Sequence, residues 1–233
     1  MRKGTYWLWV YSLTVACFLC AVFLGSRAVS VMAESVPMER ENCIIIDAGH
    51  GGEDGGATSC TGIPESRYNL EISLRLNDLF HFLGYDTKMI RTTDISVYTK
   101  GKTIAQKKNS DLKERVRMVN DIENGLLLSI HQNNFPDSRY SGAQIFYADT
   151  EGSQFLAKQL QDSFIATLNP GSSRQSKKSS GIYLMEHIQC TGVLVECGFL
   201  SNAAEEAKLA NPEYQKKVCC VIAATVAGFL SNT

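Results

Sequence analysis

The sequence predicts a single α/β domain whose largely parallel, mixed sheet is flanked by helices. Three short apolar runs lack the alternation of polar residues that marks a strand with one wet face, and such runs are typical of strands covered on both sides. Segments with apolar residues at helical spacing lie between these runs, as in folds built on a parallel sheet. About 200 residues follow the N-terminal segment, which is enough for one hydrophobic core.

The expected elements alternate along the chain. We expect strands, each a short run rich in apolar residues, at 43–47, 86–90, 126–130, 142–147 and 193–195. We expect helices, each with apolar residues on one face, at 68–83, 112–121, 152–168 and 213–230. Gly84 ends the first helix, and the third carries Phe155, Leu156 and Leu160 on its apolar face. Two polar stretches rich in lysine or serine are predicted loops, at 94–110 and 169–180.

The first 33 residues differ from the rest of the chain. Arg2 and Lys3 precede an uncharged, mostly apolar run at 6–24, which is typical of an export signal or a membrane anchor. The run is close to the ~20 residues that span a bilayer, while residues 31–33 offer the small side chains that a signal peptidase reads. We therefore predict export. The expected organisation is a signal peptide or anchor, a polar linker and a folded domain, at 1–33, 34–42 and 43–231.

The composition excludes one class of partner. The chain has 23 basic and 24 acidic residues, and the first 33 residues hold three of the basic ones and no acidic one. The remainder is mildly acidic and lacks the basic field that nucleic acid attracts, so no nucleic-acid partner is expected. Beyond the N-terminal segment, the cysteines make no paired CxxC spacing. We expect most of them to be small buried hydrophobic residues and no disulfide framework.

Polar side chains follow the three buried apolar runs. His50 comes after the first run, His131 after the second and Glu196 after the third. Because ligands bind at the carboxyl ends of strands in open α/β sheets, we expect these side chains to meet at one edge of the sheet. Two histidines and one carboxylate, with a water in the fourth position, make the ligand set of a catalytic zinc site.

The remaining carboxylate of such a site should come from the loop after His50. Glu65 is the best candidate because it lies just before the first helix, and Glu53 and Asp54 compete for that place. Each residue also has a structural interpretation. A lone histidine can satisfy a neighbouring carbonyl, Glu65 can be a carboxylate favoured by the helix dipole, and Glu196 can be a buried ion-pair partner.

Four segments in one order resemble the zinc-dependent N-acetylmuramoyl-L-alanine amidases of the amidase-3 family. They are IIIDAGHGG at 44–52, Glu65, LSIHQN at 128–133 and VECGFLSN at 195–202. The similarity runs from about Cys43 to Leu230. Four further residues, at equivalent places in that family, are Arg91, Asp94, Arg115 and Asn120. The short single-domain form is most similar to the germination-specific amidases of spore-forming bacteria.

The resemblance implies a site and a reaction. By that likeness His50, Glu65 and His131 bind one Zn²⁺ per chain, Glu196 is the catalytic carboxylate, and Asn133 binds substrate or supports His131. The bond cut would be the amide between the lactyl group of N-acetylmuramic acid and L-alanine in peptidoglycan, in the maturation of the spore cortex. Two departures from the family pattern spare the predicted ligands. Alanine replaces a common proline at 48, and bulkier polar residues stand at 132 and 134.

The sequence is also compatible with other functions. A zinc metallopeptidase acting on wall peptides would use the same ligand set, and a catalytically silent wall-binding protein would need none of its chemistry. A cysteine nucleophile paired with a distant histidine is a further alternative. No wall-binding repeat accompanies the domain. We therefore expect targeting or activation by a partner protein, or membrane contact through the N-terminal segment if it is not cleaved. The expected location is the cell wall or another extracytoplasmic space.

Overall fold

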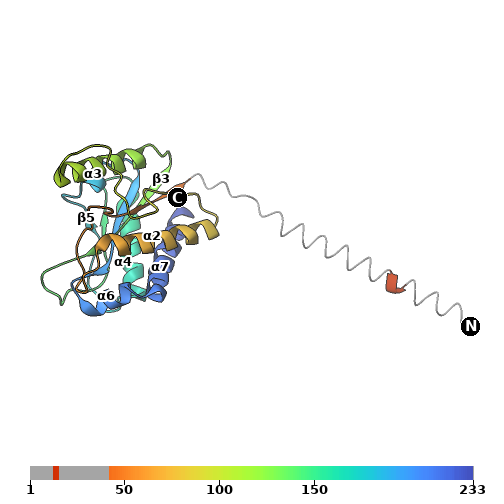
Figure 1. Cartoon of the computed structure of the whole chain (residues 1–233). Coiled ribbons are helices and arrows are strands. Elements are labelled where there is room, and N and C mark those ends of the chain that lie inside the picture. Colours follow the sequence, from red (N-terminus) through yellow and green to blue (C-terminus); the bar gives the residue numbers. More distant parts are fainter. Residues whose placement is uncertain (1–12, 16–41, 233) are drawn as a thin grey trace, which may run out of the picture. The chain divides into compact units, whose positions relative to one another are not determined.

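The computed structural model describes residues 13–15 and 42–232 (Figure 1). Its contacts divide the chain into two units, Met1–Glu39 and Arg40–Thr233. In the first unit only the helical residues 13–15 are described, so the predicted signal or anchor and the predicted linker lie almost wholly outside the described residues. Within the described part of the chain, no helix has the length and apolar character needed to cross a bilayer.

A six-stranded mixed sheet forms the centre of the second unit. Its order is β2-β1-β3-β6-β4-β5, with β2, β1, β3 and β6 parallel and β4 antiparallel to β6. The strands are β1 (Cys43–Ala48), β2 (Thr87–Met89), β3 (Gly125–Asn133), β4 (Gln144–Tyr147), β5 (Lys177–Lys178) and β6 (Thr191–Phe199). The predicted largely parallel mixed sheet is confirmed. The all-apolar runs are β1, β3 and β6, its central strands.

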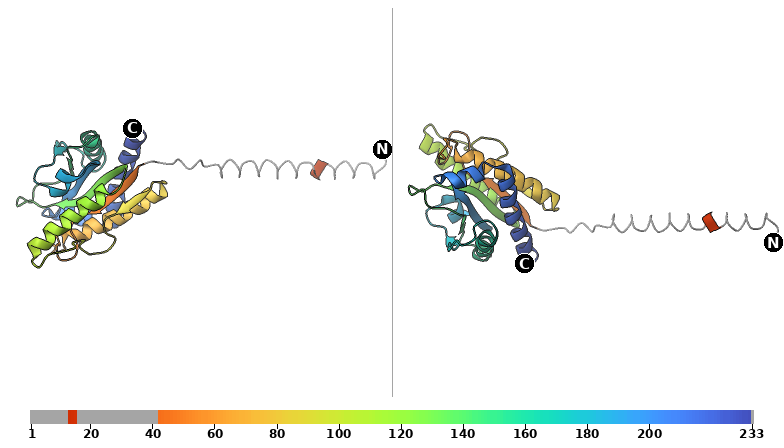
Figure 2. Two further views of the ribbon diagram at one scale, coloured as in Figure 1. Left: turned by 90° about the horizontal axis from the view of Figure 1, so that it is seen from above. Right: turned by 90° about the horizontal axis from the view of Figure 1, so that it is seen from below.

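Helices cover both faces of this sheet, which is why its central strands are apolar on both sides. One face is covered by α2 (Glu65–Phe82), α4 (Ser153–Thr167), α6 (Ala203–Leu209) and α7 (Pro212–Leu230), and the other by α3 (Ile104–Asn120) and α5 (Tyr183–His187). Figure 2 shows α3 in front of the strands from above and α7 in front from below. Within β1, Ile44 and Ile46 pack in the first layer and Ile45 in the second.

Helix α3 begins eight residues before the predicted start, so the prediction of a loop up to residue 110 is wrong. Thr103 and Gln106 form a capping box, in which each side chain accepts a hydrogen bond from the other residue's backbone N–H, and this sequence signal was overlooked. The face of α3 that is buried carries Ser110, Asp111 and Arg115 beside Val119. A helix that buries polar residues shows little apolar periodicity, which explains the error.

Three smaller expectations also differ from the structure. Phe155, expected with Leu156 and Leu160 on the buried face of α4, is 57% exposed because its neighbours at helical spacing already fill that face. The structure adds two short helices, α5 and α6, that the sequence did not predict. Six described cysteines are free, and only Cys197 and Cys219 are buried. The expectation that most cysteines are buried is therefore wrong for the described part of the chain.

Candidate metal centre

The loop that carries His50 leaves the carboxyl end of β1 in an unusual backbone conformation. His50 has a φ of 60°, in the left-handed region that non-glycine residues rarely adopt, and Gly51 and Gly52 also have positive φ. Such a conformation persists only where surrounding contacts hold it. Here Arg115 Nη2 donates to the His50 carbonyl at 2.7 Å, and Arg91 Nη2 donates to the Gly49 carbonyl at 3.0 Å.

Two buried arginines therefore frame this loop. Arg91 Nε and Arg115 Nη1 both donate to the Ala48 carbonyl, at 2.8 and 3.0 Å. Arg115 also pairs with Asp47 and, at 2.6 Å, with Asp111. Burial opposes the ionisation of Asp47, but Arg115 outweighs this effect and holds the pKa of the carboxyl below its usual range. Four guanidinium nitrogens, two from each arginine, thus donate to the carbonyls at the end of β1.

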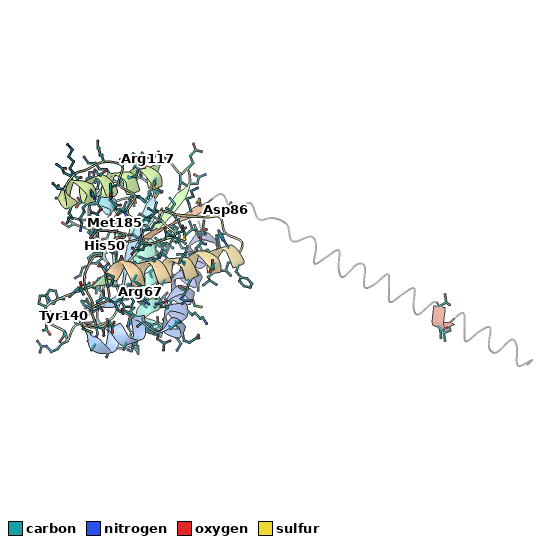
Figure 3. All side chains as sticks on the ribbon, viewed as in Figure 1. His50, Arg67, Asp86, Arg117, Tyr140 and Met185 are labelled. Carbon is teal, nitrogen blue, oxygen red and sulfur yellow. The ribbon has the colours of Figure 1, made fainter. Side chains whose placement is uncertain are left out.

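Three predicted ligands meet in front of this loop. His131 Nδ1 lies 2.9 Å from Glu65 Oε1, and His50 Nε2 lies 3.3 Å from Glu65 Oε2. The two imidazole rings are 5.0 Å apart in an edge-to-face arrangement, and one ligand atom from each of the three residues lies within 4.8 Å of the others. The structure brings together residues from a loop, from the start of α2 and from β3. Figure 3 shows His50 near the N-terminal end of α2.

Glu65 is held by contacts other than the histidines. Its Oε1 accepts from Asn69 Nδ2 at 3.1 Å and from the backbone N–H of Gln132 at 3.2 Å, and its Oε2 accepts from the Ala57 N–H at 3.0 Å. Asn69 also donates to the Gly49 carbonyl at 3.1 Å, so it links the helix to the His50 loop. The carboxylate is 4% exposed and has a fixed orientation toward both imidazoles.

The two other carboxylates considered from the sequence lie outside this cluster. Asp54 Oδ2 lies 2.9 Å from His50 Nδ1, the ring nitrogen that faces away from Glu65. Such a carboxylate fixes the orientation and tautomer of a ligand histidine. Glu53 is exposed and pairs with Lys107. Among the three candidates, Glu65 therefore joins the histidines and Asp54 orients one of them.

The charges of the cluster fit a bound cation. Burial raises the pKa of Glu65, but hydrogen bonds from His131 and His50 outweigh it and hold that pKa far below its usual range. Burial lowers the pKa of His50, but Asp54 and Glu65 outweigh this effect and raise it to about 9. The carboxylates thus favour positive charge at this place, and Zn²⁺ would supply that charge in exchange for the proton on His50, leaving neutral imidazoles as its donors.

Two glycines leave the space that the cluster occupies. A Cβ added at Gly49 would lie 2.1 Å from His131 Nε2, and one added at Gly56 would lie 2.7 Å from Glu65 Oε2 and from His50 Cδ2. Both distances are far inside van der Waals contact, so the imidazoles and the carboxylate require glycine at these positions. The donor set and the glycine cradle together fit a zinc ion held by His50, Glu65 and His131.

Glu196 lies beside this cluster without belonging to it. In the parallel register of β3 and β6 it is the partner of His131, and residues paired in this way project from the same face of a sheet. Its Oε2 is buried and makes no hydrogen bond within the described residues. Burial raises the pKa of Glu196 to about 7, with Glu65 adding to the effect and the two histidines opposing it. A carboxyl with this pKa can both accept and donate a proton near neutral pH.

The model of the N-acetylmuramoyl-L-alanine amidase family matches residues 44–227. The chain belongs to this family. Over 225 residues it is 35% identical to the germination-specific N-acetylmuramoyl-L-alanine amidase of Bacillus subtilis. This match covers 95% of this chain and 93% of that relative. The resemblance seen in the sequence is thereby confirmed, and so is the enzyme class. The protein is an amidase of peptidoglycan and not a silent binding protein.

Solved structures agree with this assignment. The CwlD amidase of Clostridioides difficile, solved in complex with the GerS lipoprotein, is 36% identical with a TM-score of 0.78, and the match covers 82% of this chain and 99% of that one. An N-acetylmuramoyl-L-alanine amidase of Clostridium difficile 630 is 26% identical with a TM-score of 0.71, covering 82% of this chain and 97% of that one. The single α/β domain is thus the fold of known amidases.

The structure refines where the amidase carries its site residues. His131 and Glu196 were expected just after their strands, but β3 continues to Asn133 and β6 to Phe199, so both side chains project from within the sheet. Asn133 accepts a hydrogen bond at its carbonyl from Leu200 N–H at 2.8 Å. Its side chain makes no hydrogen bond within the described residues, and the residue stands outside the ligand cluster.

The other family-like positions support the frame of the site. Asp94 accepts from the Gly52 N–H at 3.0 Å, and Asn120 joins α3 to the residues around α5 through the His187 carbonyl and the Gln189 N–H. Sequence reasoning missed Asn69. Its spacing of four residues from Glu65 on a helix places the two side chains on one face, and that signal could have identified it.

Proposed function

We propose that this amidase hydrolyses the bond between the lactyl group of N-acetylmuramic acid and L-alanine with one Zn²⁺ held by His50, Glu65 and His131. The observation that carries this proposal is the buried Glu65 carboxylate set between two imidazoles, with Glu196 on the neighbouring strand. Zinc in such a site supplies Lewis acidity, which acidifies a water molecule and polarises the amide carbonyl.

Glu196 performs the proton transfers in this proposal. As the carboxylate it takes a proton from the attacking water while the new C–O bond forms. It then gives that proton to the alanine nitrogen as the C–N bond breaks, because an amide nitrogen leaves readily only after protonation. Burial raises the pKa of Glu196, which makes this carboxylate a better base toward water than an exposed one. The unpartnered Oε2 of Glu196 leaves an acceptor free for that proton.

The neighbours of the histidines set which nitrogen faces the cluster. The Asp54 carboxylate next to His50 Nδ1 favours a proton there, so the Nε2 lone pair would be available to hold Zn²⁺. For His131 the arrangement is reversed, because Nδ1 faces Glu65 and Nε2 lies against Gly49. We assign these tautomers from the hydrogen-bond partners.

A thiol nucleophile has less support than water. Cys197, next to Glu196 in the chain, is buried, and burial raises the pKa of its thiol well above the usual range. The reactive thiolate is therefore scarce at neutral pH. Attack by water, with Glu196 as the base, agrees better with the charges around this strand.

The cellular setting is proposed from the relatives and from the N-terminal sequence. The relative named as germination-specific supports action in the spore cortex, and the CwlD amidase solved with a lipoprotein supports a partner protein for this chain as well. Residues 1–33 support export, either as a signal peptide or as an anchor. We further propose that the side chain of Asn133, at the end of β3, contacts the substrate.

The test compares the full chain with Glu196→Gln, and with Glu123→Gln as a matched control on an exposed loop residue. Zinc is measured by elemental analysis, and peptides released from peptidoglycan are identified by mass spectrometry. All three proteins should bind about one zinc, because the described residues contain one such ligand set. Only Glu196→Gln should fail to release peptides that begin with L-alanine. Loss of zinc in that variant, or shortened peptides as the product, would contradict the assigned roles.

A further inference from the structure

A cleft of about 990 Å³ opens beside the catalytic strand. Gln144 lines this cleft and is also the register partner of Glu196, so the cleft begins one strand away from the catalytic carboxylate. Tyr140 lines it as well. Figure 3 shows Tyr140 toward the same end of the domain as His50, and Asp86, which precedes β2, at the opposite end. The cleft therefore lies at the same end of the domain as the zinc site, beside the strand that carries Glu196.

The walls of the cleft are positively charged. Arg139, Arg174, Lys177 and Lys208 line it. Among the described residues Arg174, Lys177 and Lys208 pair with no acidic side chain, whereas Arg139 pairs with Asp137. The one acidic lining residue is Glu205, whose buried Oε2 already accepts from the backbone N–H groups of Gly142 and Phe199, at 2.8 and 3.0 Å. A cleft with unpaired cations in a mildly acidic domain attracts anions.

Arg174 is held in a fixed position within this cleft. Its guanidinium lies 4.8 Å from the centroid of the Phe199 ring and 5.9 Å from that of Tyr140. Nε donates to the Ser141 carbonyl at 3.0 Å, and Nη1 donates to Gln144 Oε1 at 3.3 Å. Within the described chain Nη2 makes no hydrogen bond. An immobilised guanidinium with free donors is preorganised to bind a carboxylate.

We propose that this cleft is the binding site for the acidic stem peptide of the substrate, with Arg174 contacting a peptide carboxylate. The inference deepens the proposed function and rests on it. The glycan is uncharged near the cleaved bond, because the muramic carboxyl is part of the amide, so the anionic part of the substrate is the peptide beyond L-alanine. The peptide therefore extends from Glu196 across β4 into the basic cleft, and the glycan lies on the other side of the metal centre.

The experiment uses two muramyl tripeptides, one with every carboxylate free and one with every carboxylate amidated. The full chain and its Arg174→Gln variant are compared by kcat/KM for release of the peptide. Arg174→Gln should lower kcat/KM on the acidic substrate by about tenfold, mainly through KM, because it removes a charge-assisted hydrogen bond. On the amidated substrate it should change kcat/KM by less than about twofold, since that ligand offers no carboxylate.

Two further variants control for folding and for general charge. The double variant Lys177→Gln with Lys208→Gln alters exposed side chains only, and should lower kcat/KM on the acidic substrate about threefold, in keeping with exposed charge pairs. Lys113→Gln, an exposed lysine on α3 that lines a different pocket, should leave both substrates unaffected. Equal losses on acidic and amidated substrates, or no loss with Arg174→Gln, would refute the subsite.

The subsite can also be tested apart from catalysis. The released acidic tripeptide and its amidated form are titrated by calorimetry into the full chain and into Arg174→Gln. The acidic peptide should bind the full chain about tenfold more tightly than it binds the variant, and the amidated peptide should bind both alike. If the enzyme cleaves neither muramyl peptide yet this difference appears, the proposed function fails and the subsite stands. Equal binding of the two peptides overturns the subsite alone.

Discussion

Replacing Arg115 by methionine tests whether buried charge holds the metal centre together. The side chain is 3% exposed and its main partner Asp47 is 1% exposed. Methionine keeps the apolar bulk but removes the ion pairs with Asp47 and Asp111 and the donors to the carbonyls of Ala48 and His50. A buried carboxylate left without its partner destabilises a fold by about 3–5 kcal/mol. This is a large part of the ~5–15 kcal/mol that holds a domain folded.

The same substitution should also weaken zinc binding. Arg115 Nη2 is the donor to the carbonyl of His50, whose backbone is left-handed. Without that donor the loop can relax and the imidazole loses its fixed position. Loss of an outer contact to a metal ligand typically lowers affinity about 10–100-fold. The affinity is measured by competition with a chromophoric chelator, using protein that is still folded.

Two further variants decide whether buried charge is the cause. The free energy of unfolding in urea, measured on metal-free protein, should be recovered in large part when Asp47→Asn is added to Arg115→Met, because the more deeply buried of the two carboxylates then carries no unpaired charge. Arg117→Met removes exposed ion pairs on the same helix and should cost less than about 1 kcal/mol. A loss of under about 1 kcal/mol in Arg115→Met, or a double variant that loses the sum of the two single losses, would refute the reasoning.

Two other perturbations follow from the packing around the site. Gly49→Ala should abolish zinc binding and lower activity at least about 100-fold, because its Cβ would lie 2.1 Å from His131 Nε2. The control is Gly228→Ala, where an added Cβ meets nothing within 4 Å. Zinc content and peptide release are measured for both variants. Glu206 is buried, and burial raises its pKa, but hydrogen bonds from Thr61, Tyr68 and Ser59 outweigh this and lower it. Its stabilising contribution is therefore complete above about pH 4.3 and disappears as the pH falls through the folded-state pKa. The difference in unfolding free energy between metal-free wild type and Glu206→Gln should shrink below about pH 4, and a difference that is constant or grows contradicts this assignment.

The buried strands were predictable, whereas part of the helical layer was not, and the exposed two-residue strand β5 lies in a stretch predicted as a loop. β1, β3 and β6 are buried between two helical layers, so their apolar runs appear directly in the sequence. Helix α3 packs on the sheet near the metal centre with Asp111 and Arg115 inside. Its inward face is charged because it binds the ends of β1, and such a face resembles a solvated surface in a sequence.

Part of the metal site could likewise be predicted from the sequence and part could not. His50 and His131 could be chosen from the sequence because both belong to a strand or its end, where a topology rule applies. Sequence position and the family resemblance favoured Glu65 over Glu53 and Asp54, but the roles of the other two, with Asp54 beside His50 and Glu53 paired with Lys107, follow only from distances. Arg174 could not be chosen at all. It lies in a serine- and lysine-rich stretch, and only its contacts with Phe199 and Gln144 distinguish it from a solvated arginine.

The two framing arginines explain why this amidase keeps charge in its interior. The carbonyls of Ala48, Gly49 and His50 at the end of β1 lie beside the buried side chains of Arg91 and Arg115, and carbonyls left unpaired there would be costly. Apolar side chains cannot pair with them, and a lysine offers one ammonium where the loop needs several donors in fixed directions. Arg91 and Arg115 supply those donors, and Asp47 and Asp111 then balance the charge of Arg115. The buried charges are thus a consequence of holding a histidine in a left-handed turn. Arg115→Lys should therefore disturb the metal centre although it keeps the charge.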